Sequence, residues 1–219
     1  MLLAVLSGFL LAVAVPALYR LAGSYIGWVL ALLPASLTAY FASLIPAIRG
    51  GEKLLLETPW MPGLGITLDF MVDGLSLVFA LLISGIGTFI LIYAGSYLKG
   101  HKDLARFYVI MLSFMASMLG LVLSDNLITF FVFWELTSIT SYMLIGFNHE
   151  DTEARKFALQ GLFVTAGGGL VLMAGLILLI FITGDSSFSG LLATELSIHE
   201  HPYYTAAAVC ILIGAFTKS

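Results

Sequence analysis

One carboxylate lies in the middle of a long apolar stretch. Glu135 falls within residues 126–147, which read NLITFFVFWELTSITSYMLIGF. In a helix that rises about 1.5 Å per residue, Glu135 lies about 13 Å from Asn126, close to the centre of a hydrocarbon core about 30 Å thick. A charge at that depth is costly unless it faces water or a partner, and such residues commonly mark ion pathways. The position of Glu135 therefore favours a function in proton or cation movement across a membrane.

Hydroxyl side chains accompany Glu135 along the same predicted helix. Ser138 and Tyr142 share its face at spacings i+3 and i+7, and Thr137 and Ser141 fall on neighbouring faces. A short row of hydroxyls can solvate a carboxylate in lipid, so these four residues are candidates for a supporting polar path. The alternative is a structural carboxylate that ties helices together by hydrogen bonds.

Lys218 is a second ionisable residue, near the end of the last apolar segment. Burial favours a neutral amine and a nearby carboxylate favours an ammonium, so a buried lysine of this kind is poised to gain or lose a proton. The alternative is a lysine that extends its amino group to the far interface, because a helix beginning near Tyr203 places Lys218 about 22 Å deep. Glu135 and Lys218 are thus the candidate proton-translocation residues.

The motifs of other chemistries are missing from the sequence. The single cysteine, Cys210, lies in an apolar run and excludes a disulfide framework or a Cys-based metal site. We find no Walker motif, no dinucleotide fingerprint and no His or Cys set suited to haem or an iron–sulfur cluster. We therefore expect no enzyme activity, cofactor, metal site or nucleic-acid partner.

The composition predicts an all-α polytopic membrane protein. The chain is 60% hydrophobic and 10% charged, whereas a soluble domain carries about 25% charged residues. Seven apolar segments are long enough to cross a bilayer, at about 2–19, 25–48, 72–98, 107–124, 126–147, 157–182 and 203–219.

The loops between these segments predict the orientation. Six positive residues fall in one set of loops: Arg20, Lys99, Lys102, Arg106, Arg155 and Lys156. The alternate set holds only Arg49 and Lys53. Because cytoplasmic loops carry the excess of Lys and Arg, we expect the N-terminus outside.

The connection at 49–71 is too polar and too interrupted to span a membrane. Pro59, Pro62, Gly63 and Gly65 separate two short apolar runs, which predicts an external β-hairpin. At the other end, the sequence stops at Ser219, directly after Lys218 and within an apolar segment. We therefore expect the chain to be the first part of a longer protein.

Three stretches resemble the proton-translocating antiporter-like subunits that Mrp-type sodium/proton antiporters, respiratory complex I and membrane-bound hydrogenases share. They are 106–126 (RFYVIMLSFMASMLGLVLSDN), 133–138 (FWELTS) and 142–147 (YMLIGF). Residues 68–76 (LDFMVDGLS) and 214–219 (GAFTKS) fit as well, so the resemblance covers roughly residues 65–219.

Within this family, the ELTS that follows Trp134 and the LFVTAGGGL at 162–170 are similar to the large A subunits of Mrp antiporters. The resemblance implies that Glu135 is the fifth-helix glutamate and Lys218 the seventh-helix lysine of a proton channel, and that the two interact. Family members have about fourteen core helices. Residues 1–219 would then form the N-terminal part of an antiporter-like membrane domain, half of one channel.

The function that the resemblance implies is that of one component of a multi-subunit Na⁺/H⁺ antiporter in the cell membrane, whose partners are the other subunits. One alternative is a proton-pumping subunit of complex I or of a membrane-bound hydrogenase, in which redox chemistry elsewhere drives the pump. A second alternative is a membrane scaffold whose buried charges only hold helices together.

Overall fold

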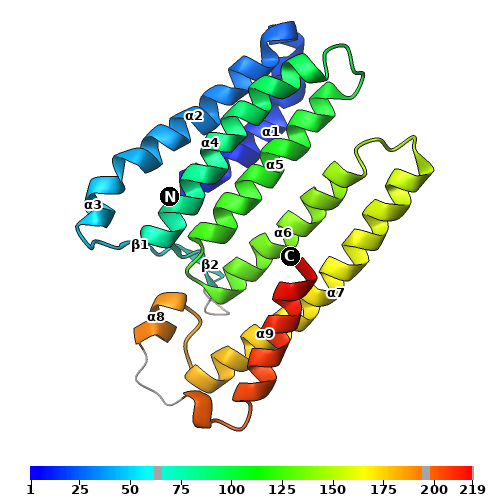
Figure 1. Ribbon diagram of the computed structural model, residues 1–219. Helices are drawn as coiled ribbons and strands as arrows, with labels where there is room; N and C mark the ends of the chain where they lie inside the picture. Colours follow the sequence, from blue (N-terminus) through cyan, green and yellow to red (C-terminus); the bar gives the residue numbers. More distant parts are fainter. Residues whose placement is uncertain (62–65, 194–197, 219) are drawn as a thin grey trace. The chain divides into compact units, whose positions relative to one another are not determined.

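The computed structural model describes residues 1–61, 66–193 and 198–218, and the fold is helical (Figure 1). Within these residues, six helices are long and apolar enough to cross a membrane. They are α1 (Leu2–Ala22), α2 (Ile26–Ser43) with its extension α3 (Ile45–Arg49), α4 (Gly74–Tyr97), α5 (Leu104–Leu123), α6 (Leu127–Ile145) and α7 (Thr152–Thr183). A shorter apolar helix, α9 (Tyr204–Lys218), follows the short elements η1 (Gly23–Tyr25), α8 (Phe188–Ala193) and η3 (Ile198–Glu200). The predicted all-α polytopic fold is confirmed.

Two helix boundaries differ from those expected from apolar runs. The segment expected at 25–48 is interrupted, because α2 ends at Ser43 and α3 starts again with Pro46 in its first turn, where the missing proline N–H costs nothing. Helix α7 begins at Thr152 rather than near residue 157, because Asp151 caps it by accepting a hydrogen bond from the Glu153 amide at 2.9 Å. Hydropathy alone misses a polar first turn of this kind.

The predicted hairpin between the second and third long helices is confirmed as two nested antiparallel pairs. Strand β1 (Leu54–Leu56) pairs with β4 (Phe70–Val72). Strand β2 (Pro59–Met61) pairs with β3 (Ile66–Thr67), with an irregularity in the register. Of the turn residues that predicted the hairpin, Pro62, Gly63 and Gly65 lie outside the described part of the chain.

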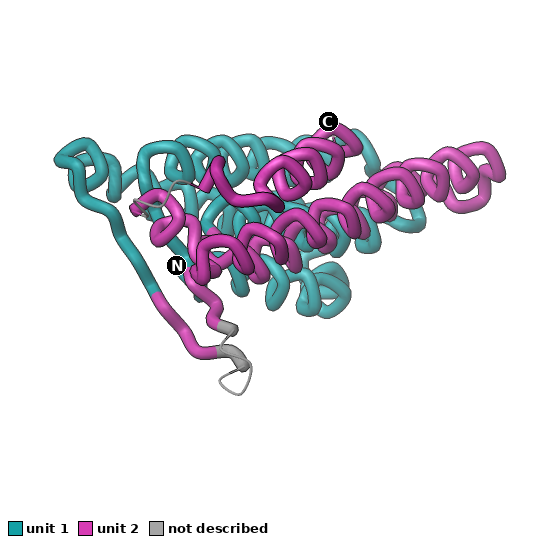
Figure 2. Tube along the Cα trace, turned by 90° about the horizontal axis from the view of Figure 1, so that it is seen from below, with its two compact units in different colours: residues 1–56, 70–123 teal, residues 57–69, 124–219 magenta. Residues whose placement is uncertain are grey.

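The chain divides into two compact units (Figure 2). Unit 1 comprises residues 1–56 and 70–123, and unit 2 comprises residues 57–69 and 124–219. The hairpin is shared, since β1 and β4 belong to unit 1 and β2 and β3 to unit 2. The expected single domain over residues 1–219 stays a prediction.

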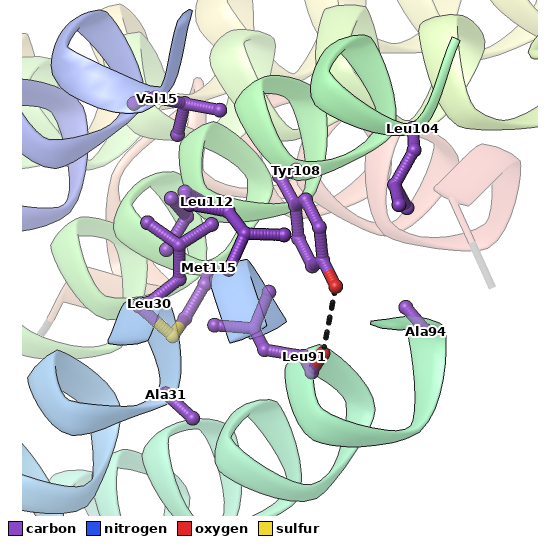
Figure 3. Close-up of a cluster of buried hydrophobic side chains, with 11 residues drawn as sticks. Val15, Leu30, Ala31, Leu91, Ala94, Leu104, Tyr108, Leu112 and Met115 are labelled. Carbon is purple, nitrogen blue, oxygen red and sulfur yellow. Dashed lines mark hydrogen bonds between the residues drawn. The ribbon is translucent and has the colours of Figure 1, made fainter. Parts of the chain in front are cut away.

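Unit 1 is built around Tyr108 of α5, which is fully buried. Figure 3 shows its hydroxyl group donating a hydrogen bond to the Leu91 carbonyl of α4, at 3.2 Å. Room for the ring comes from Gly27 of α2, where a β-carbon would lie 2.7 Å from the Tyr108 oxygen. Leu112 and Met115 extend the same core along α5. The burial of a tyrosine with its hydroxyl group satisfied allows close packing of three helices.

Unit 2 is held together by close helix packing and by a polar cluster. Helix α9 packs along α7 (Figure 1), and a β-carbon at Gly214 would lie 2.5 Å from Cβ of Leu172. Such small residues let helix backbones approach closely in a membrane. Asn126 caps α6 by accepting from the Ile128 and Thr129 amides, at 2.9 and 3.2 Å. The buried Asp125 beside it accepts from the amide of Ser189 at 2.9 Å. These contacts fix the start of α6, and with it the depth of Glu135.

Candidate functional site

The amino group of Lys218 lies among oxygen atoms of α6. Its Nζ donates hydrogen bonds to Oγ1 of Thr137 at 2.8 Å, to Oγ of Ser138 at 2.6 Å and to the Trp134 carbonyl at 3.3 Å. It also lies 5.4 Å from the centroid of the Trp134 ring, within the range of a cation–π contact. An ammonium has three protons to donate, and here all three have acceptors.

The helical repeat explains why these acceptors converge. Trp134, Thr137 and Ser138 are spaced i, i+3 and i+4, so they lie on one face of α6. The hydroxyl groups of Thr137 and Ser138 donate to the Trp134 carbonyl at 2.7 and 3.2 Å, which leaves their lone pairs free to accept from Lys218. Both hydroxyl side chains are buried. The site is therefore a hydroxyl cage built on a single turn of α6.

Glu135 lies beside this cage but does not contact the lysine. No ion pair within 4.0 Å joins Glu135 and Lys218 among the described residues. The two groups are nevertheless near enough to interact electrostatically. Oε1 of Glu135 is buried and has no hydrogen-bond partner in the described part of the chain. The carboxyl group lies instead against Gly169 of α7, where a β-carbon would lie 3.0 Å from Cδ.

A cavity of about 90 Å³ opens next to the amino group of Lys218, between α6 and α7. Its polar lining comes from the side chains of Ser138, Ser141, Tyr142 and Thr165. The cavity extends along α6 as far as Ile145, at the end of that helix. Because one water needs only about 10–15 Å³ of such space and a few polar partners, the cavity has room for several water molecules.

The structure brings the predicted site residues together in a different pairing from the one expected. Ser138 and Thr137 were expected to solvate Glu135, but their hydroxyl groups bind Lys218. Tyr142 and Ser141 line the cavity. The amino group of Lys218 donates to the Trp134 carbonyl of α6.

Three residues of the site escaped sequence reasoning: Trp134, Thr165 and Gly169. Trp134 contributes a backbone carbonyl, which no sequence pattern can reveal, although it directly precedes Glu135. Thr165 and Gly169 are four residues apart on α7, a spacing typical of helix packing. What the spacing could not show is that Gly169 lies under the carboxyl group of Glu135.

Two family profiles match this chain. The profile described as "NADH:quinone oxidoreductase/Mrp antiporter, TM" matches residues 124–219. The profile described as "NADH-Ubiquinone oxidoreductase (complex I), chain 5 N-terminus" matches residues 60–108. The chain belongs to this family of complex I and Mrp antiporter membrane subunits, which confirms the resemblance noted in the sequence.

The large A subunits of Na⁺/H⁺ antiporters are among the similar relatives. The A1 subunit from Staphylococcus haemolyticus is 42% identical over 99% of this chain and 27% of its own length. The corresponding A-type subunit from Alkalihalophilus pseudofirmus is 41% identical over 99% of this chain and 27% of its own length. The chain therefore spans about a quarter of the length of these relatives.

Solved structures show the same arrangement of helices. A chain of the Mrp complex from a Dietzia species superposes with a TM-score of 0.88 at 34% identity, covering 99% of this chain and 23% of that one. A chain of the archaeal membrane-bound sulfane sulfur reductase superposes with a TM-score of 0.78 at 18% identity, covering 97% of this chain and 43% of that one. The second likeness shows the fold alone.

Proposed function

We propose that this chain contributes a proton-translocation path to a multi-subunit antiporter that exchanges Na⁺ for protons. The observation that carries the proposal is the position of Lys218, whose amino group is held by hydroxyl groups near a half-buried glutamate and beside a polar cavity. The names of the antiporter relatives support sodium and protons as the transported ions.

In this proposal Lys218 is the proton-carrying group. The cage of Thr137 and Ser138 holds the protonated amino group at a fixed place, and the cavity beside it brings water within reach of Nζ. Ser141 and Tyr142 supply hydroxyl groups along that cavity. Glu135 acts on the lysine through its charge, since a carboxylate favours a nearby ammonium.

The proposal includes the setting of the chain. It is a multi-pass protein, and we place it in the cell membrane with its N-terminus outside, bound to other antiporter subunits. Transport of this kind moves ions without making or breaking covalent bonds in a substrate, so the chain is not an enzyme.

The decisive experiment measures sodium-dependent proton flux in everted vesicles that contain the complete complex. Glu135→Ala and Lys218→Ala should each abolish the flux while the complex still assembles, because the first removes the charge and the second removes the proton-carrying group. Lys218→Arg should also impair transport, because a guanidinium group keeps its charge at every physiological pH. Normal flux in Glu135→Ala, or full activity in Lys218→Arg, contradicts the proposed path.

A redox-driven pump is the second candidate function, because the descriptions of both matching family profiles name an NADH oxidoreductase that uses a quinone. The same vesicles separate the two functions. An antiporter exchanges Na⁺ for protons when only an ion gradient is supplied, whereas a redox pump needs an electron donor and acceptor. Exchange in the absence of redox substrates favours the antiporter.

A further inference from the structure

Two adjacent glycines of α7 lie where side chains from two other helices meet its backbone. A β-carbon at Gly169 would overlap Oε1 of Glu135 on α6. A β-carbon at Gly168 would overlap Oγ1 of Thr217 on α9 and lie 2.8 Å from its Cγ2. At the preceding Gly167, a β-carbon would have no atom within 4 Å. Two of the three consecutive glycines therefore contact specific side chains of other helices, and the third does not.

The two side chains that contact these glycines belong to the candidate site. One is Glu135 itself, and the other, Thr217, directly precedes Lys218. Thr217 is held in place because its hydroxyl group donates to the Gly214 carbonyl at 2.8 Å. One turn of α7 thus receives both the carboxyl group and the helical turn that carries the lysine.

We propose that Gly169 is a positioning residue, whose missing side chain lets the carboxyl group of Glu135 lie against α7 and so sets its separation from Lys218. This inference rests on the proposed function. The buried Oε1 of Glu135 has no hydrogen-bond partner among the described residues, so no donor holds it in place. The carboxyl group can lie there because Gly169 has no side chain.

The fold tolerates a methyl group at this position better than the site does. Oε1 is the far end of a flexible side chain, so rotation about the side-chain bonds of Glu135 relieves the overlap without moving either backbone. Alanine is also a better helix former than glycine. Gly169→Ala should therefore move the carboxyl group while α7 keeps its structure.

A double-mutant cycle in the complete complex tests the inference. Gly169→Ala should lower sodium-dependent proton flux about tenfold or more, since a misplacement near 1 Å can cost up to about 100-fold. Gly167→Ala is the matched control and should keep the flux of the unmodified complex. Glu135→Asp withdraws the carboxyl group by one methylene, away from the new methyl group. The double variant Glu135→Asp/Gly169→Ala should therefore lose no more flux than Glu135→Asp alone.

Two results overturn the inference: equal flux in Gly169→Ala and Gly167→Ala, or losses from Gly169→Ala and Glu135→Asp that multiply in the double variant. If Gly169→Ala does not assemble, restored assembly in the double variant supports the inference, and failure to restore it overturns the inference. Glu135→Ala distinguishes a failure of the positioning role from a failure of the proposed function. Loss of flux in Glu135→Ala with full flux in Gly169→Ala defeats only the positioning role, whereas full flux in Glu135→Ala defeats the proposed function itself.

Discussion

At the scale of single residues, the half-buried Lys218 is satisfied by neutral oxygen atoms rather than by a carboxylate. An ammonium removed from water needs hydrogen bonds to offset the loss, and Lys218 obtains three from one turn of α6. Glu135 is left to act across space, where a low local dielectric strengthens its effect. In the proposed function, the cage holds the amino group in place and the carboxylate adjusts how tightly the lysine holds its proton.

The cage makes a prediction about its two hydroxyl groups. Hydrogen bonds to charged groups contribute about 1.5–3 kcal/mol each, so Thr137→Val combined with Ser138→Ala should reduce sodium-dependent proton flux by about tenfold or more. The measurement is flux in vesicles, with the amount of assembled complex determined in parallel.

Thr140→Val is the control for this pair. Thr140 lies on the same helix and is also buried, but its hydroxyl group donates to backbone carbonyls of α6, chiefly that of Leu136 at 2.7 Å. Its replacement should leave flux close to normal. If Thr140→Val and the paired substitution lower flux equally, the hydroxyl groups act on the helix and not on the lysine.

At the scale of elements, capping side chains fix where three of the long helices begin. Asn126 caps α6, Asp151 caps α7 and Asp73 caps α4. At α4 the capping is reciprocal: Oδ1 of Asp73 accepts from the Ser76 amide at 2.8 Å, and the Ser76 hydroxyl accepts from the Asp73 amide at 2.8 Å. Burial acts to raise the pKa of Asp73, but the hydrogen bonds from Ser76 and the Leu75 amide, together with the charge of Lys53, outweigh it and lower that pKa below its usual value.

The lowered pKa gives a pH-dependent prediction. Asp73→Ala should cost about 1 kcal/mol of stability at neutral pH, the usual value of an N-cap. A carboxyl group whose pKa is lowered by folding stabilises the native state above its unfolded pKa of about 3.9, and this contribution is lost as pH falls through the folded value. In thermal unfolding of the detergent-solubilised complex, the gap between Asp73→Ala and the unmodified protein should be present at pH 7 and shrink below about pH 4. A gap independent of pH contradicts a role for the ionised carboxylate.

At the scale of the whole molecule, the loops place an excess of positive charge at only one end of α4. Lys53 precedes β1, which pairs with the strand leading into α4, and Lys102 lies in the loop that follows α4. The two lysines therefore lie at opposite ends of a helix long enough to cross the membrane. Because cytoplasmic loops carry the excess of Lys and Arg, we propose that the end of α4 next to Lys102 lies in the cytoplasm.

Cysteine labelling tests this orientation. In a Cys210→Ala background, which removes the single cysteine of residues 1–219, an impermeant maleimide should label Lys53→Cys in intact cells. It should label Lys102→Cys only after the cells are permeabilised. The reverse pattern would place the N-terminus in the cytoplasm and contradict the proposed orientation.

The sequence by itself determined the class of fold and the candidate charges. An apolar run long enough to span a bilayer has few alternatives to a helix, because backbone groups in lipid must bond internally. A carboxylate or a lysine inside such a run is conspicuous for the same reason, so Glu135 and Lys218 could be found by reading. Hydropathy was less reliable at helix ends, as the polar first turn of α7 shows.

Only the tertiary structure decided which groups meet. The sequence placed Ser138 and Thr137 near Glu135 along one helix, yet their hydroxyl groups bind a lysine 80 residues or more away in the chain. The contact between the Glu135 carboxyl group and Gly169 could not be predicted either, because a glycine has no side chain whose chemistry indicates a partner. The physical reason is that periodicity within one helix fixes which residues share a face, whereas the packing of α7 and α9 fixes what that face touches.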